Sequence, residues 1–449
     1  MKVITLETPS LGDRSYLVHD GSVALVVDPQ RDIDRVLDAA DDAGVAIGHV
    51  VETHVHNDYV SGGLALSRML GATYSHAADE PLRFDHHGVR GGDRFDVGEL
   101  AVEVVHTPGH THHHLSFVVR HGGHPPAVFT GGSLLYGTVG RTDLISDDAI
   151  DELTRAQFRS ARQLADSLPD DTQVFPTHGF GSFCASASGE GESDGTLGTE
   201  RSINIALTVD DEDAFVDRLV SGLTAHPRYY AQMSPMNLAG ASPIDLSPPA
   251  PVDPVELARR IHRGEWVVDL RQRRAFAADH LAGTIGIELA DPFVTYLGWL
   301  LPWGMPVTLL AETPDDLTEA QRQLVRIGID RPAGGVSGTL DDWAPDHDHR
   351  SYPSVTFGEV ASEGPDRTIL DVRRDDERAE DHIDGSIHVP IHELTERVEE
   401  LPDTELWVHC ASGFRASIAA SLLDRAGRDV VLIDDDYANA ADSGLTIVT

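Results

Sequence analysis

Three potential metal ligands, His54, His56 and Asp58, alternate with other residues in one short segment of the chain. An apolar run, His49–Val51, precedes them and predicts a buried strand, and helical spacing of apolar residues follows them. The ligands are therefore expected on a turn between a strand and a helix. Side chains diverge on such a turn, so two imidazoles and a carboxylate can converge on one metal ion or on two adjacent ions. The alternative is a solvated polar loop.

A second chemical motif is the hexapeptide Cys410–Arg415, which lies between a predicted strand, Leu406–His409, and a predicted helix that ends at Gly427. A thiol at a strand–helix junction faces backbone N–H groups and the positive end of a helix, and both stabilise a thiolate. Arg415 adds a fixed positive charge for an anionic sulfur donor. Four residues separate Cys410 from Arg415, whereas a phosphatase loop has five, so the tighter ring favours sulfur transfer over phosphate transfer.

The other cysteine, Cys184, lies six residues after His178 in a loop rich in Gly and Ser. Two interpretations stay open for it: a small buried residue, or a sulfur acceptor near a pocket. The two cysteines lie far apart in sequence, which excludes a disulfide framework, so each thiol needs its own explanation.

The elements that must position these residues alternate between strand and helix through the first region, residues 1 to about 235. Ser146 predicts a helix N-cap because acidic residues follow it in the positive first turn, and Asp210 predicts a second N-cap. Two of the predicted strands lead into loops that carry further histidines, His110 and His178. The strands predicted from apolar runs are Val23–Val27, Ala101–Val105, Leu115–Val119, Ala127–Thr130 and Val174–Gly179.

Four segments of this region resemble, in the same order along the chain, the motifs of the metallo-β-lactamase fold: Thr53–Asp58, Thr107–Thr111, Phe129–Ser133 and Pro176–Gly179. The resemblance implies a four-layer αββα sandwich with its metal site between two sheets. Within that superfamily, Gly137–Leu144 and Pro176–Cys184 resemble the branch fused to rhodanese domains, whose relatives include persulfide dioxygenases and glyoxalase-type thioesterases. The metal ligands that the resemblance implies are His54, His56, His110, Asp58 and His178.

The chain departs from the family pattern at two positions. Tyr59 stands where the family has a histidine, and Gly132 stands where it has a bridging aspartate. A mononuclear Fe(II) dioxygenase of this fold would use His54, His110 and that aspartate. We therefore expect at most one Fe(II) or Zn(II) ion, weakly held, and no nucleotide cofactor, and we expect Gly132→Asp to tighten metal binding. The triplet His112–His114 is expected to be polar lining or surface.

Beyond a proline-rich stretch, residues 234–254, which predicts a semi-rigid linker, the chain repeats itself. In each copy a strand enters an Asp-x-Arg turn and leads to a His-x-x-Gly sequence. Both copies resemble rhodanese domains, which are α/β sandwiches around a parallel sheet. The matching pairs are Trp266–Arg271 with Thr368–Arg373, and His280–Gly283 with His382–Gly385.

The first copy lacks a thiol, because its equivalent strand, Val307–Leu310, runs into the acidic segment Ala311–Asp316. Acidic residues there would repel an anionic donor, so we expect this copy to be an inactive scaffold. The predicted fold class is α/β, an N-terminal αββα sandwich followed by two rhodanese-like domains with parallel sheets. The predicted divisions are a metallo-β-lactamase-like domain (1–235), a linker (236–254), an inactive rhodanese-like domain (255–347) and an active rhodanese domain (353–449).

The composition is strongly acidic: 74 Asp and Glu residues against 34 Lys and Arg residues give a formal net charge of −40. The acidic residues are spread over all regions, and the only lysine is Lys2. This pattern indicates a surface that holds hydrated cations, as in the cytoplasm of a halophile. Such a surface repels nucleic acid and anionic membranes, and no stretch is apolar enough to span a bilayer. We expect a cytoplasmic protein, and a homo-oligomer.

These features together predict a sulfur-metabolism enzyme. The resemblance implies that the first domain oxidises a low-molecular-weight thiol persulfide to sulfite. The second rhodanese copy would carry sulfane sulfur on Cys410 and exchange it with sulfite, thiosulfate or another acceptor. Two alternatives stay open for the first domain: a zinc thioester hydrolase, in which metal-bound water attacks a carbonyl, and a non-catalytic module that binds a thiol.

Overall fold

The computed structural model describes residues 1–179, 181–186, 195–364 and 367–449, which form two compact units. The first unit comprises Met1–Asp245 together with Gln323–Asp330, and the second comprises Leu246–Arg322 together with Arg331–Thr449. Both expected rhodanese copies have their sheets in the second unit, although residues 323–330 of the first copy belong to the first unit. The finer division into three domains and a linker stays a prediction.

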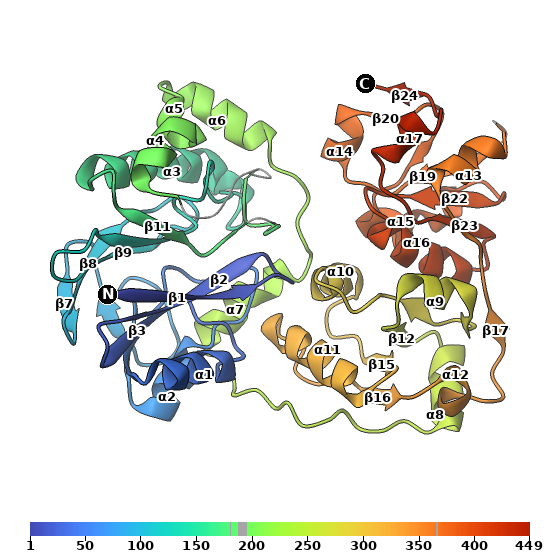
Figure 1. Ribbon diagram of the computed structural model, residues 1–449, viewed down its shortest axis with the longest axis horizontal. Helices are drawn as coiled ribbons and strands as arrows, with labels where there is room; N and C mark the ends of the chain where they lie inside the picture. The colour runs from blue at the N-terminus through green and yellow to red at the C-terminus, as the bar shows by residue number, and fades with distance from the viewer. Residues whose placement is uncertain (180, 187–194, 365–366) are drawn as a thin grey trace. The chain divides into compact units, whose positions relative to one another are not determined.

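Two sheets face each other in the first unit (Figure 1). The first has the order β1-β2-β3-β4-β5-β6, antiparallel from β1 to β3 and parallel from β3 to β6. The second has the order β11-β10-β9-β8-β7, in which only the pair β10–β11 is parallel among the described strands. The strands are β1 (Lys2–Thr8), β2 (Asp13–His19), β3 (Val23–Val27), β4 (Ala46–Val51), β5 (Thr73–Ala77), β6 (His87–Val89), β7 (Arg94–Val97), β8 (Leu100–His106), β9 (Leu115–Arg120), β10 (Ala127–Gly131) and β11 (Gln173–Pro176).

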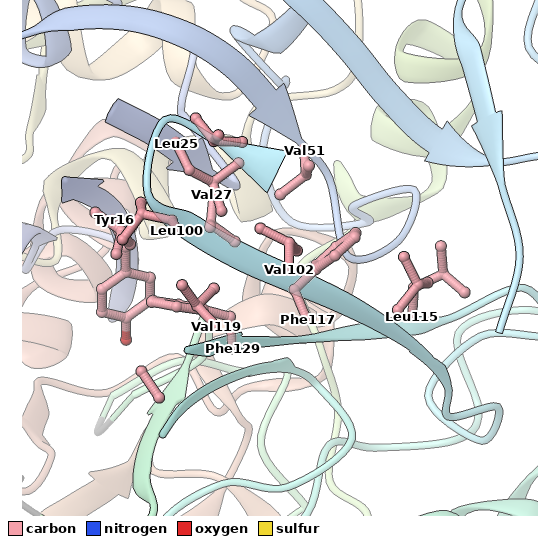
Figure 2. Packing of buried hydrophobic residues seen from close by; sticks show 14 of the residues in the cluster. Tyr16, Leu25, Val27, Val51, Leu100, Val102, Leu115, Phe117, Val119 and Phe129 are labelled. Atoms are coloured by element: carbon pink, nitrogen blue, oxygen red, sulfur yellow. The ribbon is translucent and has the colours of Figure 1, made fainter. Parts of the chain in front are cut away.

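The main core of this unit fills the space between the two sheets (Figure 2). Tyr16 and Val27 reach it from the first sheet, and Phe117 and Phe129 reach it from the second. The rings of Tyr16 and Phe129 meet edge to face with their centroids 5.2 Å apart, a favourable aromatic arrangement. Strands with one face against this core and the other under helices read as continuous apolar runs, which is why β3 is predicted from sequence with its observed bounds.

Helices cover the outer face of each sheet. Helices α1 (Asp34–Ala43) and α2 (Gly63–Leu70) pack on the first sheet through residues such as Val36 and Leu66. Helices α3 (Ile150–Ser167) and α6 (Glu212–Ser221) pack on the second sheet through Phe158 and Phe215. The predicted four-layer αββα sandwich is therefore confirmed.

The helix starts and the linker differ in detail from the sequence expectations. Ser146 precedes a short 3-10 turn, η1 (Asp147–Ala149), but its side chain makes no capping bond. Asp211 instead of Asp210 caps α6, because the helix begins one residue later than predicted, and its carboxylate accepts from the Ala214 N–H at 2.8 Å. The remaining helices of this unit are α4 (Leu197–Ile203), α5 (Ile205–Thr208) and α7 (Tyr230–Ala239), and α7 occupies the first residues of the predicted linker.

The second unit contains two sheets in which every described strand pair is parallel, as predicted. Their orders are β14-β12-β15-β16 and β18-β23-β22-β19-β21. The strands are β12 (Trp266–Asp269), β14 (Ile285–Gly286), β15 (Val307–Ala311), β16 (Gly334–Ser337), β18 (Ser354–Val355), β19 (Thr368–Asp371), β21 (Ile387–His388), β22 (Leu406–His409) and β23 (Val430–Ile433).

Short antiparallel pairs and several helices complete this unit. The pairs are β13 (His280–Leu281) with β17 (His349–Arg350), and β20 (His382–Ile383) with β24 (Ile447–Val448). The helices are α8 (Pro254–His262), α9 (Arg273–Ala278), α10 (Phe293–Leu300), α11 (Pro314–Arg326), α12 (Leu340–Trp343), α13 (Phe357–Ser362), α14 (Asp375–Glu380), α15 (Ile391–Arg397), η2 (Val398–Glu400), α16 (Phe414–Arg425) and α17 (Asn439–Asp442). Within the described ranges, no helix has the length and apolar character needed to cross a membrane.

Candidate functional site

Four fully buried imidazoles from three segments meet in the first unit. His54 and His56 follow β4, His110 follows β8, and His178 follows β11. The ring centroids of His54 and His56 lie 4.2 Å apart, those of His54 and His110 lie 4.7 Å apart, and those of His110 and His178 lie 5.1 Å apart. The structure thus brings together all four histidines that the sequence resemblance implied.

The hydrogen bonds of His54 and His110 fix which ring nitrogen carries the proton. Thr53 donates its hydroxyl to Asp28 at 2.7 Å, so at 2.9 Å that hydroxyl accepts from Nδ1 of His54. Nδ1 of His110 lies 2.7 Å from the carbonyl oxygen of Arg141, which can only accept. Both Nε2 atoms therefore carry lone pairs, and both are buried without a hydrogen-bond partner in the described structure. Such an arrangement is typical of imidazoles prepared for a metal ion.

His56 is held by three groups at its Nε2 atom. Glu52 lies 3.1 Å away, Asp28 lies 3.4 Å away and the hydroxyl of Tyr59 lies 3.0 Å away. Burial opposes a charge on this ring, but the carboxylates of Asp28 and Glu52 raise the pKa of His56 to about 10. Its other nitrogen, Nδ1, has no hydrogen-bond partner among the described residues. A metal ion can take the place of the proton on that nitrogen.

His178 repeats this arrangement with a pair of aspartates. Its Nδ1 atom lies 3.0 Å from Asp13 and 3.2 Å from Asp58, and its Nε2 atom has no hydrogen-bond partner within the described ranges. Burial again opposes charge, yet the two carboxylates raise the pKa of His178 to about 9. In contrast, burial and neighbouring imidazoles lower the pKa of His110 to about 3. The cluster thus combines neutral imidazoles with imidazoles that neighbouring carboxylates keep protonated.

His114 is a buried histidine with a different role. The sequence predicted the triplet His112–His114 to be polar lining or surface. For His114 the surface alternative is wrong, because this side chain is fully buried and its ring stacks on that of His54 with the centroids 5.0 Å apart. Its Nε2 accepts from the N–H of Gly132 at 3.0 Å, and its Nδ1 lies 2.9 Å from the hydroxyl of Thr107. Because both nitrogens are engaged, His114 fixes the backbone at Gly132 and has no lone pair left for a metal.

The position where the family has its bridging aspartate offers no room for a side chain. A Cβ atom on Gly132 would lie 2.5 Å from Cγ of the His110 ring. This geometry argues against the expectation that Gly132→Asp would tighten metal binding, because the new side chain would meet the His110 ring. At the second departure, Tyr59 is buried and donates its hydroxyl to the Asp28 carbonyl at 3.3 Å, so it supports the loop as a phenol.

Cys184 lies beside the histidines, with its side chain fully buried. One ligand atom each of His110, His178 and Cys184 lie within 4.8 Å of one another, and the same holds for His54, His56 and His178. Burial raises the pKa of the Cys184 thiol well above its usual range, and Asp58 and Asp13 raise it further. Imidazole nitrogens, a thiol and nearby carboxylates form a donor set that fits Zn²⁺ or Fe²⁺.

Several supporting residues were not found by sequence reasoning. Asn237 donates to the carbonyl oxygens of His56 and Tyr59, both at 2.9 Å, and accepts from the N–H of Ser61 at 2.8 Å. It lies in the stretch predicted to be linker, so only the long-range fold brings it to the histidine loop. Asp13, Asp28 and Glu52 were also missed, and they lie outside the quoted motifs. Thr53 and Arg141 lie inside quoted motifs, but sequence reasoning assigned them no supporting role.

The second chemical site lies at the C-terminal end of β22, where Cys410 is almost fully buried. The loop turns through Gly413, whose φ of +87° is the left-handed conformation that glycine adopts at least cost. A Cβ atom on Gly413 would also overlap the carboxylate of Asp434. Helix α16 begins at the next residue, Phe414, so its first backbone N–H groups lie at the end of the Cys410 loop.

The predicted positive charge of Arg415 is already paired. Its guanidinium donates to both carboxylate oxygens of Glu377, one of them at 2.7 Å. Nearby, Arg374 pairs with Asp376 at 2.9 Å. Although burial opposes it, the Glu377 carboxylate raises the pKa of Arg415. The two arginines and two carboxylates sum to zero charge, so Arg415 is not the free cation that the sequence suggested.

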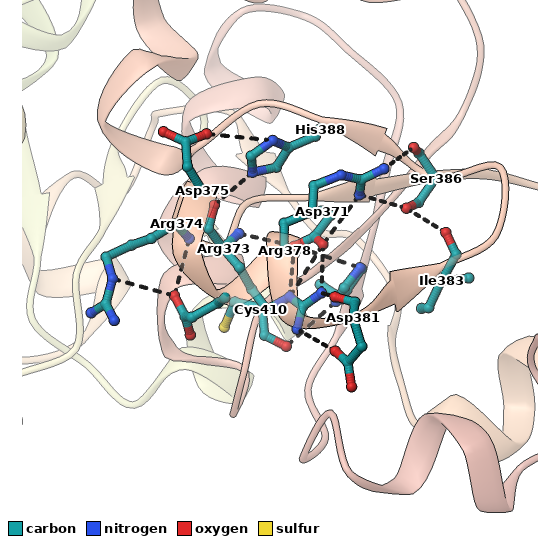
Figure 3. Close-up of polar contacts among 12 residues, drawn as sticks. Asp371, Arg373, Arg374, Asp375, Arg378, Asp381, Ile383, Ser386, His388 and Cys410 are labelled. Atoms are coloured by element: carbon teal, nitrogen blue, oxygen red, sulfur yellow. Dashed lines mark hydrogen bonds and ion pairs between the residues drawn. The ribbon is translucent and has the colours of Figure 1, made fainter. Parts of the chain in front are cut away.

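A buried ionic frame supports the strand beside the Cys410 loop (Figure 3). Arg373 donates to Asp371 through Nε at 3.0 Å and through Nη2 at 2.9 Å. Arg378 adds a contact to Asp371 at 3.3 Å and donates to the hydroxyl of Ser386 at 2.8 Å. The Asp-x-Arg sequence, which occurs in both copies, therefore has a structural role: in the second copy it forms this ionic frame.

The first rhodanese-like copy keeps the Asp–Arg pair of the frame and lacks the thiol. Arg271 donates to Asp269 at 2.7 Å. Asp269 is paired in register with Leu310, as Asp371 is with His409, so Ala311 stands where Cys410 stands in the second copy. The absence of a nucleophile, predicted from sequence, follows directly from this register.

The first copy still reaches the chemical site of the second. The ring of Tyr296, in α10, lies 5.8 Å from the ring of Phe414, centroid to centroid. Burial raises the pKa of the Tyr296 hydroxyl, while Arg415 opposes this shift and Cys410 adds to it. The first copy is therefore more than a remote scaffold, because its helix α10 borders the Cys410 loop.

Comparisons with known proteins support the fold of the regions that carry these two sites. Residues 359–442 match the family described as "Rhodanese-like domain". A hydroxyacylglutathione hydrolase from Aeromonas salmonicida is 31% identical over 167 residues, which is 37% of this chain and 60% of that protein. A hydroxyacylglutathione hydrolase from Methylococcus capsulatus is 31% identical over 179 residues, 39% of this chain and 66% of that protein. The chain thus spans about three fifths of the length of such relatives.

Among solved structures, a metallo-beta-lactamase from Staphylococcus aureus superposes with a TM-score of 0.66. It is 28% identical and covers 75% of this chain and 98% of its own. The predicted resemblances to the metallo-β-lactamase fold in the N-terminal region and to a rhodanese domain at the C-terminus are confirmed.

Proposed function

We propose that this chain, which joins a metallo-β-lactamase-fold region to a C-terminal rhodanese domain, is a sulfur-metabolism enzyme that carries sulfane sulfur on Cys410. The observation that carries the proposal is the position of Cys410, a buried thiol between the end of β22 and the first turn of α16. Backbone N–H groups at a helix start stabilise a thiolate and the anionic sulfur attached to it.

The transfer follows from the chemistry of the thiolate. Cys410 attacks the terminal sulfur of thiosulfate or of a low-molecular-weight persulfide. The S–S bond of the donor breaks, sulfite or the thiolate leaves with the electron pair, and a Cys410 persulfide forms. An acceptor such as sulfite or cyanide then attacks the outer sulfur and returns the Cys410 thiolate. No external oxidant or reductant is needed.

A direct test measures sulfur loading on the intact chain. After incubation with thiosulfate, the mass of the protein should increase by one sulfur atom, and fragmentation should place it on Cys410. Cys410→Ser should carry no added sulfur and should lose transfer to cyanide. His112→Ala, a change at an exposed position of the first unit, should behave as the unmodified chain does. Sulfur found in Cys410→Ser, or found on Cys184, would contradict the assignment.

A second activity is proposed for the first unit: metal-dependent hydrolysis of a thioester of a small thiol. Likeness to hydroxyacylglutathione hydrolases, at 31% identity, supports this reaction class. Zn²⁺ or Fe²⁺ bound at the cluster would supply a Lewis acid or a redox centre. His54, His56, His110 and His178 would hold the ion, and Asp13, Asp28 and Glu52 would orient the imidazoles.

The competing reaction, oxidation of a thiol persulfide to sulfite, stays a prediction and can be separated from hydrolysis by two assays. Cys410→Ser protein should be given a thiol ester in one assay and a thiol persulfide with dissolved oxygen in the other. Release of free thiol from the ester supports hydrolysis. Persulfide-dependent oxygen consumption supports oxidation. If protein shown to contain metal catalyses neither reaction, this result would indicate a first unit that only binds a thiol.

A further inference from the structure

We propose that Cys184 supplies the anionic metal ligand of the first unit. It takes the role of the carboxylate that the family pattern has at the position of Gly132. The inference deepens the proposed metal-dependent role of this unit and rests on it. It concerns a residue that lies after the last histidine of the cluster in sequence, at a place where the family pattern supplies no ligand.

A carboxylate side chain at position 132, where the family pattern has one, has no room in this structure. The ring of His110 lies over the Gly132 Cα, where a Cβ would approach its Cγ to 2.5 Å. The Gly132 carbonyl oxygen accepts from the N–H of Gly140 and from Nε2 of Gln157, both at 2.9 Å. The His114 ring accepts from its N–H at 3.0 Å. With both backbone groups held, this segment cannot shift to admit a ligand from position 132.

Cys184 approaches the cluster from another side. Ligand atoms of Cys184, His110 and His178 lie within 4.8 Å of one another, a spacing that allows all three to reach one ion. All three side chains are fully buried. Nε2 of His110 and Nε2 of His178 have no hydrogen-bond partner among the described residues. Two buried nitrogens without hydrogen-bond partners and a buried thiol would supply N and S donors of the kind that Zn²⁺ takes.

Arg141 positions two of these three ligands at once. Its carbonyl oxygen accepts from Nδ1 of His110 at 2.7 Å, and its N–H donates to the carbonyl oxygen of Cys184 at 2.9 Å. Its guanidinium donates to the carbonyl oxygen of Phe183 at 3.0 Å and pairs with Asp143 at 2.7 Å. A single buried residue therefore sets the distance between the imidazole and the thiol, as an outer-shell partner of a metal site does.

The charge of the site gives the reason for a thiolate. The carboxylates of Asp13 and Asp58 lie behind His178, on the far side of its ring from Nε2. A thiolate bound directly to a divalent ion removes one of the ion's two positive charges in this buried place. When the ion binds, the S–H proton leaves to solvent and the sulfur electron pair forms the bond to the metal, with no change of oxidation state. A soft sulfur ligand favours zinc, iron or cobalt over magnesium or calcium.

Cobalt is the probe that tests the proposal, because a Co²⁺–thiolate bond gives a strong charge-transfer absorption in the near ultraviolet and imidazole ligands do not. The full-length protein should bind one Co²⁺ and show this band. Cys184→Ser should lose the band and should release cobalt to a mild chelator about tenfold more readily or worse. Cys410→Ser, the matched change of the other thiol, should keep the band.

Two further results separate the possible failures. Cys184→Asp restores an anionic ligand without sulfur, so it should regain cobalt retention without the charge-transfer band. This also shows that the fold tolerates change at the position. Stoichiometric cobalt without the band in the natural chain, or an undiminished band in Cys184→Ser, would overturn the role of Cys184 alone. A natural chain that binds no cobalt, zinc or iron would overturn the metal-dependent role of the unit as well.

Discussion

Single residues decide the charge state of the histidine cluster. Burial and the neighbouring imidazoles lower the pKa values of His54 and His110, so these rings stay neutral and keep a lone pair. Carboxylates raise the pKa values of His56 and His178 above their usual 6.5. Protons thus occupy part of the cluster when no cation is present, and a bound metal ion has to displace them.

We predict that the metal-free protein loses stability as pH rises from 7 to 10. His56 and His178, with pKa values of about 10 and about 9, bind protons in the folded state that the unfolded chain releases near pH 6.5. This stabilisation is complete below the unfolded pKa and disappears as pH passes through the folded values. Asp13 and Glu52, whose pKa values burial raises to about 7, release their protons at the lower end of this window, and their titration adds to the loss of stability.

The loss should be on the order of a few kcal/mol in the free energy of unfolding, measured by denaturant titration of chelator-treated protein at successive pH values. His178→Gln should show a shallower dependence, because one of the two proton-binding groups is gone. An unfolding free energy that stays constant over this range would refute the assigned charge states.

Gly132→Asp is predicted to weaken metal binding, opposite to the expectation from sequence alone. The added side chain meets the His110 ring and must push it away from the cluster. Overpacking of this kind costs about 1–3 kcal/mol in stability as well. Metal content after dialysis against a mild chelator is the measurement. Gly123→Asp, at a surface glycine with open space around it, is the control. Higher metal retention in Gly132→Asp would contradict the geometry.

Glu377→Gln is predicted to lower the KM for thiosulfate. Glu377 neutralises Arg415, and an amide keeps the shape while it removes the competing charge. A gain of about 1 kcal/mol corresponds to about a fivefold lower KM. Steady-state sulfur transfer to cyanide measures it. Glu393→Gln provides the control, because Glu393 pairs with the partly exposed Arg397 on α15. An unchanged or higher KM would show that Glu377 serves mainly to hold Arg415 in place.

At the scale of elements, one side chain from α7 organises the loop that carries His54 and His56. Asn237 satisfies three backbone groups of that loop, and it is nearly buried. We predict that Asn237→Ala lowers the free energy of unfolding by about 1–3 kcal/mol, because buried backbone groups lose their partners. Metal retention should fall in parallel, since the loop loses its fixed conformation.

Thermal unfolding and metal content of the variant measure both effects. Asn439→Ala removes an exposed asparagine that contacts Asp435 and serves as the matched control. If Asn237→Ala loses stability and keeps its metal, the loop is held by its other contacts and the second half of the prediction fails.

Elements with strong apolar runs or repeated motifs are predictable from the sequence. Strand β3 matches its predicted bounds, and the Asp-x-Arg repeat locates β12 and β19. The hairpin β1–β2 was missed, because β1 is an edge strand that leaves much of its length exposed. The supporting residues Asp28 and Asn237 were missed for a different reason. Their partners lie far away in sequence, and no local sequence pattern indicates these contacts.

For the whole molecule, the formal charge of −40 sets the dependence on salt. We predict that thermal unfolding shifts strongly upward from dilute buffer to molar KCl. Repulsion among the acidic groups is screened only when the Debye length is short, about 3 Å at 1 M salt. Calorimetry or circular dichroism at several KCl concentrations measures the shift. A sucrose series at matched water activity is the control, and a midpoint independent of KCl would remove the argument for a halophilic surface.

The alignment of Ala311 with Cys410 also has a historical meaning. Two copies with the same strand order around an Asp–Arg pair are the expected remains of a duplicated ancestor. In the first copy Ala311 stands in place of the nucleophile, yet the Asp269–Arg271 pair is kept. Tyr296 shows what the copy without a thiol still contributes: it forms part of the border of the Cys410 loop, so changes in one copy can alter the surroundings of the thiol in the other.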